Sequence, residues 1–136
     1  MPLRILIVEN DADDRQLMEN AFRMEGIRAS IQFIYGIDLP ARLQDPGIRP
    51  QLIILAMNAQ PYNGTELTRQ IRSTEGYGSI PIVILSDSIL PHEVEAAYSA
   101  GASSFIQKPP SYSDTLFKVR SFINYWFHTV ELPSLP

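Results

Sequence analysis

At 136 residues, with 45% hydrophobic and 19% charged side chains, the chain has the length and composition of one globular domain with a single core. Its net charge of −4 argues against nucleic acid as a partner, because phosphate binding needs a basic surface, and no apolar run reaches the roughly 18 residues of a membrane span. The absence of cysteine excludes disulfides and thiolate metal sites and, with an N-terminus that lacks a signal-peptide pattern, leads us to expect a cytoplasmic protein.

Short apolar runs alternate with segments of helical periodicity along the chain. In chain order the pattern predicts a strand over 3–8, a helix over 12–25, a strand over 31–35, a short helix over 36–43, a strand over 52–55, a helix over 65–73, a strand over 80–85, a helix over 91–99, a strand over 104–107 and a last helix to about residue 130. Residues 45–47 (Asp-Pro-Gly) predict a turn before the third strand. The predicted domain covers 1–130, and 131–136 form a tail.

Glycine, proline and serine mark several predicted helix ends. Gly26 and Gly101 follow helical segments and are expected to stop them. Pro91 suits the first turn of its helix, and Ser111 or Ser113 can cap the last one. These residues support the boundaries drawn from the apolar periodicity.

The order, strand then helix repeated five times, predicts an α/β protein with a parallel sheet, helices on both faces and right-handed crossovers. Five strands at this spacing favour the flavodoxin-like order 2-1-3-4-5, a three-layer sandwich with five helices. In that order the carboxyl ends of the first, third and fourth strands are neighbours. We therefore expect residues 9–11, Ala56 and Ser86 to converge on one pocket.

Four stretches carry a resemblance to a known family. Residues 4–11, 52–64, 80–86 and 101–109 resemble the motifs of bacterial two-component response-regulator receiver domains, in the family's order and on the expected elements. Within that family the chain is most similar to the single-domain, phytochrome-associated type. Receivers take a phosphoryl group from a histidine kinase onto an aspartate after the third strand, where Mg²⁺ and a lysine offset the negative charge.

The resemblance places known roles on this sequence. Ala56 falls on the phosphoacceptor, eight residues before Gly64 as in the family, and Asn58 lies in the loop beyond it. An alanine methyl cannot be phosphorylated. The other pocket positions are the acidic pair, the hydroxyl, the lysine and the switch aromatic, which fall on Glu9 and Asn10, Ser86, Lys108 and Phe105.

The acidic pair and the loop after the third strand also depart from the family pattern. Asn10 replaces a carboxylate, so Glu9 and an amide make a poor magnesium site, and we expect no cofactor and weak or lost Mg²⁺ binding. Pro61 stands one residue later than the family's proline, with Gln60 in the usual place. The resemblance therefore implies a pocket that has lost its chemistry.

The pocket residues also have ordinary structural interpretations. Residues 9–11 can satisfy the free N–H groups at the start of a helix, Ser86 can be a turn hydroxyl, and Lys108 can be a surface lysine. If these residues do form the pocket, two of them carry further expectations. Lys108 should pair with Glu9, and its bond to the following proline should be cis, as is typical of the family.

The charge of Asp87, directly after Ser86, offers a separate hypothesis. A carboxylate close to the position without an acceptor could mimic phosphorylation.

The last predicted helix carries more apolar surface than one sheet face needs. Leu116, Val119, Ile123, Trp126 and Val130 recur at three- and four-residue steps, which is enough to cover the sheet. A second aromatic surface, predicted for interaction, consists of Phe122, Tyr125, Trp126 and Phe127, with Phe117 beside them. Either Phe117 and Phe122 only widen the core face, or the aromatics form a partner surface. We favour a homodimer through this helix, residues 104–107 and the helix starting at Pro91.

The interpretation is a stand-alone pseudo-receiver in phosphorelay signal transduction, not an enzyme, that contacts a histidine kinase or another signalling protein. One alternative is an active receiver whose acceptor was changed to alanine in the laboratory. The further changes at Asn10 and Pro61 favour natural divergence over one engineered substitution. An alternative of another class is a flavodoxin-like cofactor-binding protein or enzyme.

Overall fold

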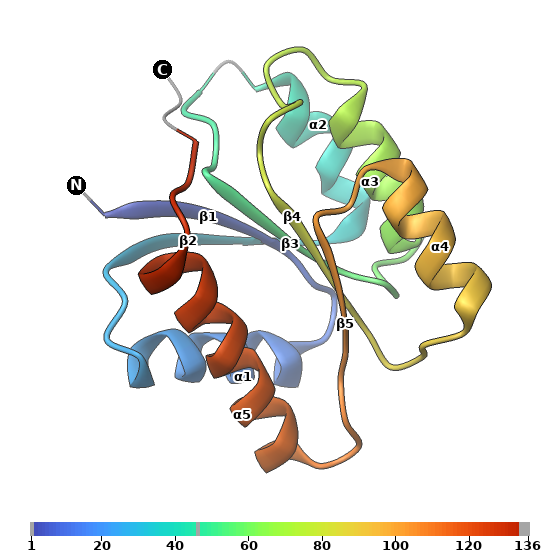
Figure 1. Ribbon diagram of the computed structural model, residues 1–136. Helices are drawn as coiled ribbons and strands as arrows, with labels where there is room; N and C mark the ends of the chain where they lie inside the picture. The colour runs from blue at the N-terminus through green and yellow to red at the C-terminus, as the bar shows by residue number, and fades with distance from the viewer. Residues whose placement is uncertain (1, 46, 134–136) are drawn as a thin grey trace.

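The computed structural model describes residues 2–45 and 47–133, and Figure 1 shows a sheet between two layers of helices. Pro46 of the predicted turn and residues 134–136 of the predicted tail lie outside the described residues. The strands are β1 (Leu3–Val8), β2 (Ala29–Ile34), β3 (Leu52–Ala56), β4 (Ile82–Ser86) and β5 (Ser104–Gln107). The helices are α1 (Ala12–Met24), η1 (Gly36–Asp38), α2 (Leu39–Gln44), α3 (Gly64–Arg72), α4 (Pro91–Ala100), α5 (Tyr112–Asn124) and η2 (Tyr125–Thr129).

The five strands form one parallel sheet in the order β2-β1-β3-β4-β5, which confirms the predicted topology. Every residue of β3 and β4 is buried, because helices cover both faces of these inner strands. In the pairing register Val8 of β1 lies opposite Leu55, and Ala56 of β3 lies opposite Leu85. The inner strands therefore end at nearly the same level, and their following loops share one edge of the sheet.

Two apolar layers hold the helices on the sheet, with α1 and α5 on one face and α2, α3 and α4 on the other (Figure 1). This confirms the predicted three-layer arrangement. The helical residues that are buried on the α1/α5 side include Leu17, Met18, Ala21, Phe22, Val119 and Ile123. Those on the other side are Leu39, Leu43, Leu67, Ile71 and Ala97.

Left-handed glycines end two helices where the sequence predicts them to end. Gly26 follows α1 with φ +66°, and Gly101 follows α4 with φ +112°, a conformation that side chains with a Cβ rarely adopt. The cap of α3 was not among the predicted helix ends. Asn63 accepts a hydrogen bond from the backbone N–H of Glu66 (2.8 Å), and the Glu66 carboxylate accepts one from the N–H of Asn63 (3.0 Å), which is a capping box.

Two strands start at other residues than predicted, and β3 extends one residue beyond its predicted end, to Ala56. β2 starts at Ala29 rather than at residue 31, because its pairing with β1 begins opposite Leu3. β4 starts at Ile82 rather than at residue 80, since Pro81 has no N–H to donate to a neighbouring strand. Ile80 is nevertheless fully buried, which explains why it looked like part of the strand.

The last helix continues beyond α5 as the π-helical turn η2 and ends before Val130, as predicted. Phe122 is only 7% exposed and packs in the core, so its assignment to an exposed interaction surface is wrong. Trp126 and Phe127 are half-buried against the same core, with the Phe127 ring edge-on to Phe22 at 5.7 Å. The core interpretation of Phe117 and Phe122 therefore holds for Phe122 but is wrong for Phe117, which is 74% exposed.

Arg72, the last residue of α3, ties together two turns at the edge of the sheet opposite the strands' carboxyl ends. Its Nε donates to the carbonyl of Gly101 (3.0 Å), and its Nη1 donates to those of Tyr77 (3.0 Å) and Ile80 (2.7 Å). Burial lowers the pKa of Arg72. The guanidinium thus holds the end of α4 and the loop before β4 against α3.

No helix among the described residues has both the length and the apolar character needed to cross a membrane.

Candidate functional site

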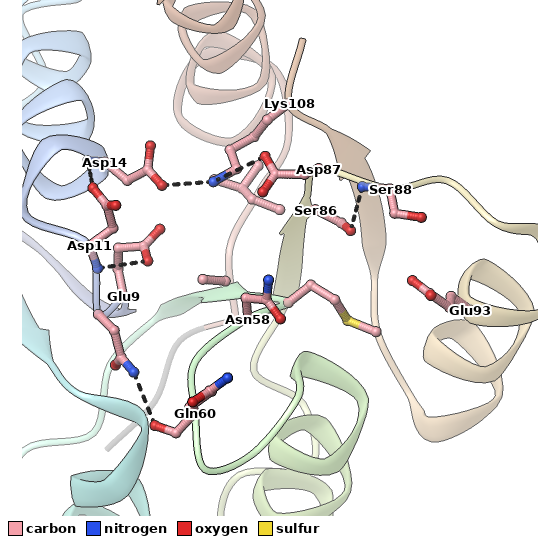
Figure 2. A pocket seen from close by; sticks show the side chains of 14 residues that line it. Glu9, Asp11, Asp14, Asn58, Gln60, Ser86, Asp87, Ser88, Glu93 and Lys108 are labelled. Carbon is pink, nitrogen blue, oxygen red and sulfur yellow. Dashed lines mark hydrogen bonds and ion pairs between the residues drawn. The ribbon is translucent and has the colours of Figure 1, made fainter. Parts of the chain in front are cut away.

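A cavity of about 590 Å³ opens where the carboxyl ends of β1, β3 and β4 meet the loop after β5 (Figure 2). Carboxylates outnumber cations in its wall: five acidic side chains face a single lysine. The lining residues are Glu9, Asn10, Asp11, Asp14, Ala56, Met57, Asn58, Gln60, Leu85, Ser86, Asp87, Ser88, Glu93 and Lys108. The structure thus brings together all six pocket residues predicted from the sequence.

Asp11 is committed to helix α1. Its Oδ1 accepts hydrogen bonds from the N–H groups of Asp13 (2.8 Å) and Asp14 (3.0 Å), so it is the N-cap of α1. For this residue the ordinary structural interpretation holds. Its carboxylate also lines the cavity, but its negative charge already stabilises the N-terminus of α1.

Glu9 is the most buried carboxylate of the site, with 5% exposure. Burial raises the pKa of Glu9 to about 7, and the negative charges of Asp14 and Asp11 add to the rise. A hydrogen bond from the Asp11 N–H (3.2 Å) and the charge of Lys108 oppose it without cancelling it. Near neutral pH this side chain is therefore divided between its protonated and ionised forms.

The side chain of Asn10 joins two neighbouring loops. Its Oδ1 accepts a hydrogen bond from the backbone N–H of Gly36 (2.9 Å), and its Nδ2 donates to the carbonyl of Gln60 (3.0 Å). The first loop follows β2 and the second follows β3. Both polar atoms of the amide are thus occupied by protein groups.

The floor of the cavity has little reactive chemistry. Ala56, the last residue of β3, is 5% exposed and contributes only a methyl group. Ser86, at the end of β4, is 3% exposed, and its Oγ accepts a hydrogen bond from the N–H of Ser88 (3.1 Å), as a turn hydroxyl does. Asn58 lies at the exposed rim, and its side chain makes no hydrogen bond with the described part of the chain.

Lys108 pairs with Asp14, not with Glu9 as predicted. Its Nζ lies 2.7 Å from Asp14 Oδ2 and 3.7 Å from Asp87 Oδ1 (Figure 2), while no ion pair with Glu9 forms within the described chain. Asp14, in the first turn of α1, reaches the lysine, whereas Glu9 is buried directly after β1. Burial alone would lower the pKa of Lys108, but the hydrogen bond and charge of Asp14, with the charges of Glu9 and Asp87, raise it overall.

The expectation of a cis bond between Lys108 and Pro109 is also wrong. The cis peptide bond found among the described residues joins Gln60 and Pro61 instead. This is the proline that stands one residue later than in the family pattern.

Magnesium, the metal that the resemblance implies, needs several oxygen ligands in near-octahedral geometry. Here the amide oxygen of Asn10 is bonded to Gly36, the carboxylate of Asp11 caps α1, and Asp14 pairs with Lys108. In residues 2–45 and 47–133, no three histidine, aspartate or glutamate side chains are grouped so that they could hold a metal ion. The residues present do not fit a resident Mg²⁺.

Asp14, Glu93 and Gln60 are the main site residues that the sequence analysis missed. Asp14 lies in the first turn of α1, three residues after the cap, and lines the cavity. Gln60 enters through its backbone carbonyl, for which a sequence contains no signal. Phe105, the predicted switch aromatic, does not line the cavity; it packs half-buried against the core, and its N–H donates to the hydroxyl of Tyr98 (3.2 Å).

Comparison with known proteins gives consistent matches over most of the chain. Residues 5–120 match the family described as the response regulator receiver domain. The response regulator Rcp1 of Synechocystis is 27% identical over 139 residues, covering 98% of this chain and 95% of Rcp1. A probable methanogenesis regulatory protein, FilR2 of Methanothrix harundinacea, is 29% identical over 131 residues, covering 92% of this chain and 84% of that protein.

Solved structures agree with the sequence matches. The phosphorylated cyanobacterial phytochrome response regulator RcpA superposes with a TM-score of 0.91 at 26% identity, covering 98% of this chain and 100% of RcpA. The Mn²⁺-bound form of Rcp1 gives the same TM-score of 0.91 at 27% identity, with the same coverage of 98% and 100%.

Proposed function

This chain belongs to the response regulator receiver domain family of two-component signalling, and we propose that it acts by protein–protein contact without phosphorylation of an aspartate. One observation carries the proposal: the third strand of the sheet ends in Ala56, whose methyl group faces the acidic cavity. A methyl group has no lone pair with which to attack phosphorus. The family match also favours a receiver over a flavodoxin-like cofactor-binding protein.

The ion pair of Lys108, which lines the same cavity as Ala56, also supports the proposal. Its Nζ contacts Asp14 at 2.7 Å and is only 13% exposed, so an intramolecular carboxylate already balances its charge. A phosphoryl group would have to compete with this contact. Asp87, the residue suggested as a phosphate mimic, is 76% exposed and lies further from the lysine, at 3.7 Å, so Asp14 fits that role better.

We also propose that Mg²⁺ binds weakly or not at all. The Mn²⁺-bound structure of Rcp1 documents metal binding in that relative. In this chain the amide of Asn10 is bonded to Gly36 and Gln60. At the end of β1 this leaves Glu9, whose pKa is raised to about 7 by burial, as the carboxylate that has no ion pair within the described chain. A carboxylate that is half protonated at neutral pH is a poor ligand for a hard cation.

Titration with beryllofluoride and Mg²⁺, followed by amide NMR shifts, tests the proposal. We expect no saturable shifts at Ser86 or Lys108 of this protein. RcpA, whose phosphorylated form is known, provides the positive control under the same conditions. Saturable shifts around Ser86 and Lys108 would overturn the proposal of an inactive pocket.

For the partner surface we propose the face formed by α4, β5 and the last helix, with a second copy of the chain or a histidine kinase as partner. Its support is exposed aromatic area: Phe117 is 74% exposed, Tyr125 51% and Tyr98 49%. Sedimentation of Phe117→Ala and Tyr125→Ala should show a smaller weight-average mass than the wild type. Ile37→Ala, on the distant η1 and 59% exposed, is the control. If the wild type sediments as a monomer, the proposal of a homodimer is refuted.

A further inference from the structure

Three loops meet at the side of the cavity where β1, β2 and β3 end. Gly36, after β2, is buried, and a Cβ built on it would overlap the carbonyl oxygen of Ala59, so the two loops touch backbone to backbone. Asn10, after β1, lies against both of them and bonds to Gly36 and Gln60. In Figure 2 a dashed line marks the hydrogen bond that the carbonyl of Gln60 accepts.

We infer that Asn10 is a positioning residue, a two-way clamp that fixes the 57–63 loop against the loop after β2 and so shapes the cavity. Its acceptor atom holds the Gly36 N–H at 2.9 Å, and its donor atom holds the Gln60 carbonyl at 3.0 Å. The inference rests on the proposed function because it assumes that Asn10 does not ligate a metal ion, which leaves its side chain to bind the two loops.

The clamp requires an amide. An aspartate at position 10 keeps an acceptor for Gly36 but has no N–H for Gln60, and it places two oxygens with partial or full negative charge against each other. An alanine removes both bonds. Substituting aspartate at position 10 would therefore release the 57–63 loop, and would not by itself recreate a cation site.

Two amides report the two halves of the clamp separately. The N–H of Gly36 donates to Asn10 itself, and the N–H of Gly64 donates to the carbonyl of Met57 (2.9 Å), which closes the 57–63 loop. Because the Gly64 N–H bonds to Met57 and not to Asn10, its exchange rate follows the order of the loop. Amides of β3, such as that of Ile54, report global unfolding.

Hydrogen exchange of four proteins, without any added ligand, tests the inference. In Asn10→Asp, exchange at Gly64 should rise roughly fivefold to tenfold, the equivalent of one lost hydrogen bond, while Gly36 stays as slow as in the wild type. In Asn10→Ala, exchange should rise at both. Asn58→Asp is the matched control: it makes the same amide-to-acid change in the same cavity, at a side chain without hydrogen bonds among the described residues, and should leave both rates unchanged.

Three results would overturn the clamp. Equal exchange rates at Gly64 in Asn10→Asp and Asn58→Asp would mean that losing the hydrogen bond to Gln60 does not loosen the loop, and that any change comes from the added charge. Continued protection of Gly36 in Asn10→Ala would mean that the amide does not hold that loop. An equal rise at Ile54 would show global unfolding rather than release of one loop. Failure of the proposed function has a different readout, because it appears only in the beryllofluoride titration at Ser86 and Lys108.

Discussion

Replacing Asp14 by asparagine should destabilise the protein by about 2 kcal/mol, because it leaves Lys108 without its main counter-ion. The variant keeps the size and most of the hydrogen-bonding capacity of the side chain and removes only the charge. Asp87 cannot take over, since it lies 3.7 Å from the lysine and is 76% exposed. The substitution therefore isolates one ion pair between α1 and the loop after β5.

The magnitude follows from the burial of the pair. Exposed ion pairs contribute about 0–1 kcal/mol, and loss of one partner from a fully buried pair costs about 3–5 kcal/mol. The side chains of Lys108 and Asp14 are 13% and 31% exposed, and the atoms are 2.7 Å apart, which places this pair between those limits. Hydrogen bonds to charged groups, at about 1.5–3 kcal/mol, lead to the same value.

Urea unfolding followed by the fluorescence of Trp126, the single tryptophan, provides the assay. A loss of about 2 kcal/mol should lower the midpoint by about 1 M urea. Asp13→Asn is the matched control, because Asp13 lies in the same first turn of α1 and makes no ion pair among the described residues. It should cost only about 0.5 kcal/mol through the helix dipole. Equal losses in the two variants would refute the role of the ion pair.

Three further changes test other parts of the structure. Between pH 4.5 and 7 folded Glu9 holds a proton that the unfolded chain has lost, so the wild-type free energy of unfolding should fall by up to about 3 kcal/mol as pH rises. Glu9→Gln should abolish this fall. If the urea midpoints of wild type and Glu9→Gln differ by the same amount at every pH, the prediction is contradicted. Arg72→Met should lower the free energy of unfolding by on the order of 3 kcal/mol, because buried carbonyls lose their donor; a thermal melt like that of the wild type would refute this. Gly36→Ala should cost about 1–3 kcal/mol through overlap with the Ala59 carbonyl, whereas Gly78→Ala, with open space around it, should be neutral in the same urea assay.

Most of the fold was predictable because it depends on short-range patterns and general topology. The short apolar run at residues 52–55 favours an inner strand, and glycines such as Gly26 and Gly101 mark turns that few other residues can form. Parallel order then brings the strand ends together. For this reason the cavity residues were found as a group before their contacts were known.

Predictions that depended on side-chain direction were less successful. The sequence offers Lys108 several acidic partners, and only the position of α1 decides that Asp14 reaches it before Glu9 does. Likewise, Phe117 and Phe122 were grouped because both are aromatic, although helix geometry places them about 140° apart, with Phe122 buried and Phe117 exposed. Backbone contacts such as that of Gln60 leave no mark in the sequence at all.

The two hydrogen bonds of Asn10 also limit the mutational paths open to this lineage. Asparagine alone offers one donor and one acceptor at this reach: aspartate lacks the donor, and glutamine is one methylene longer. At position 36 the neighbouring carbonyl of Ala59 leaves room only for glycine. A variant with a carboxylate at position 10 must therefore either lose the hydrogen bond to Gln60 or also rebuild the loop after β3.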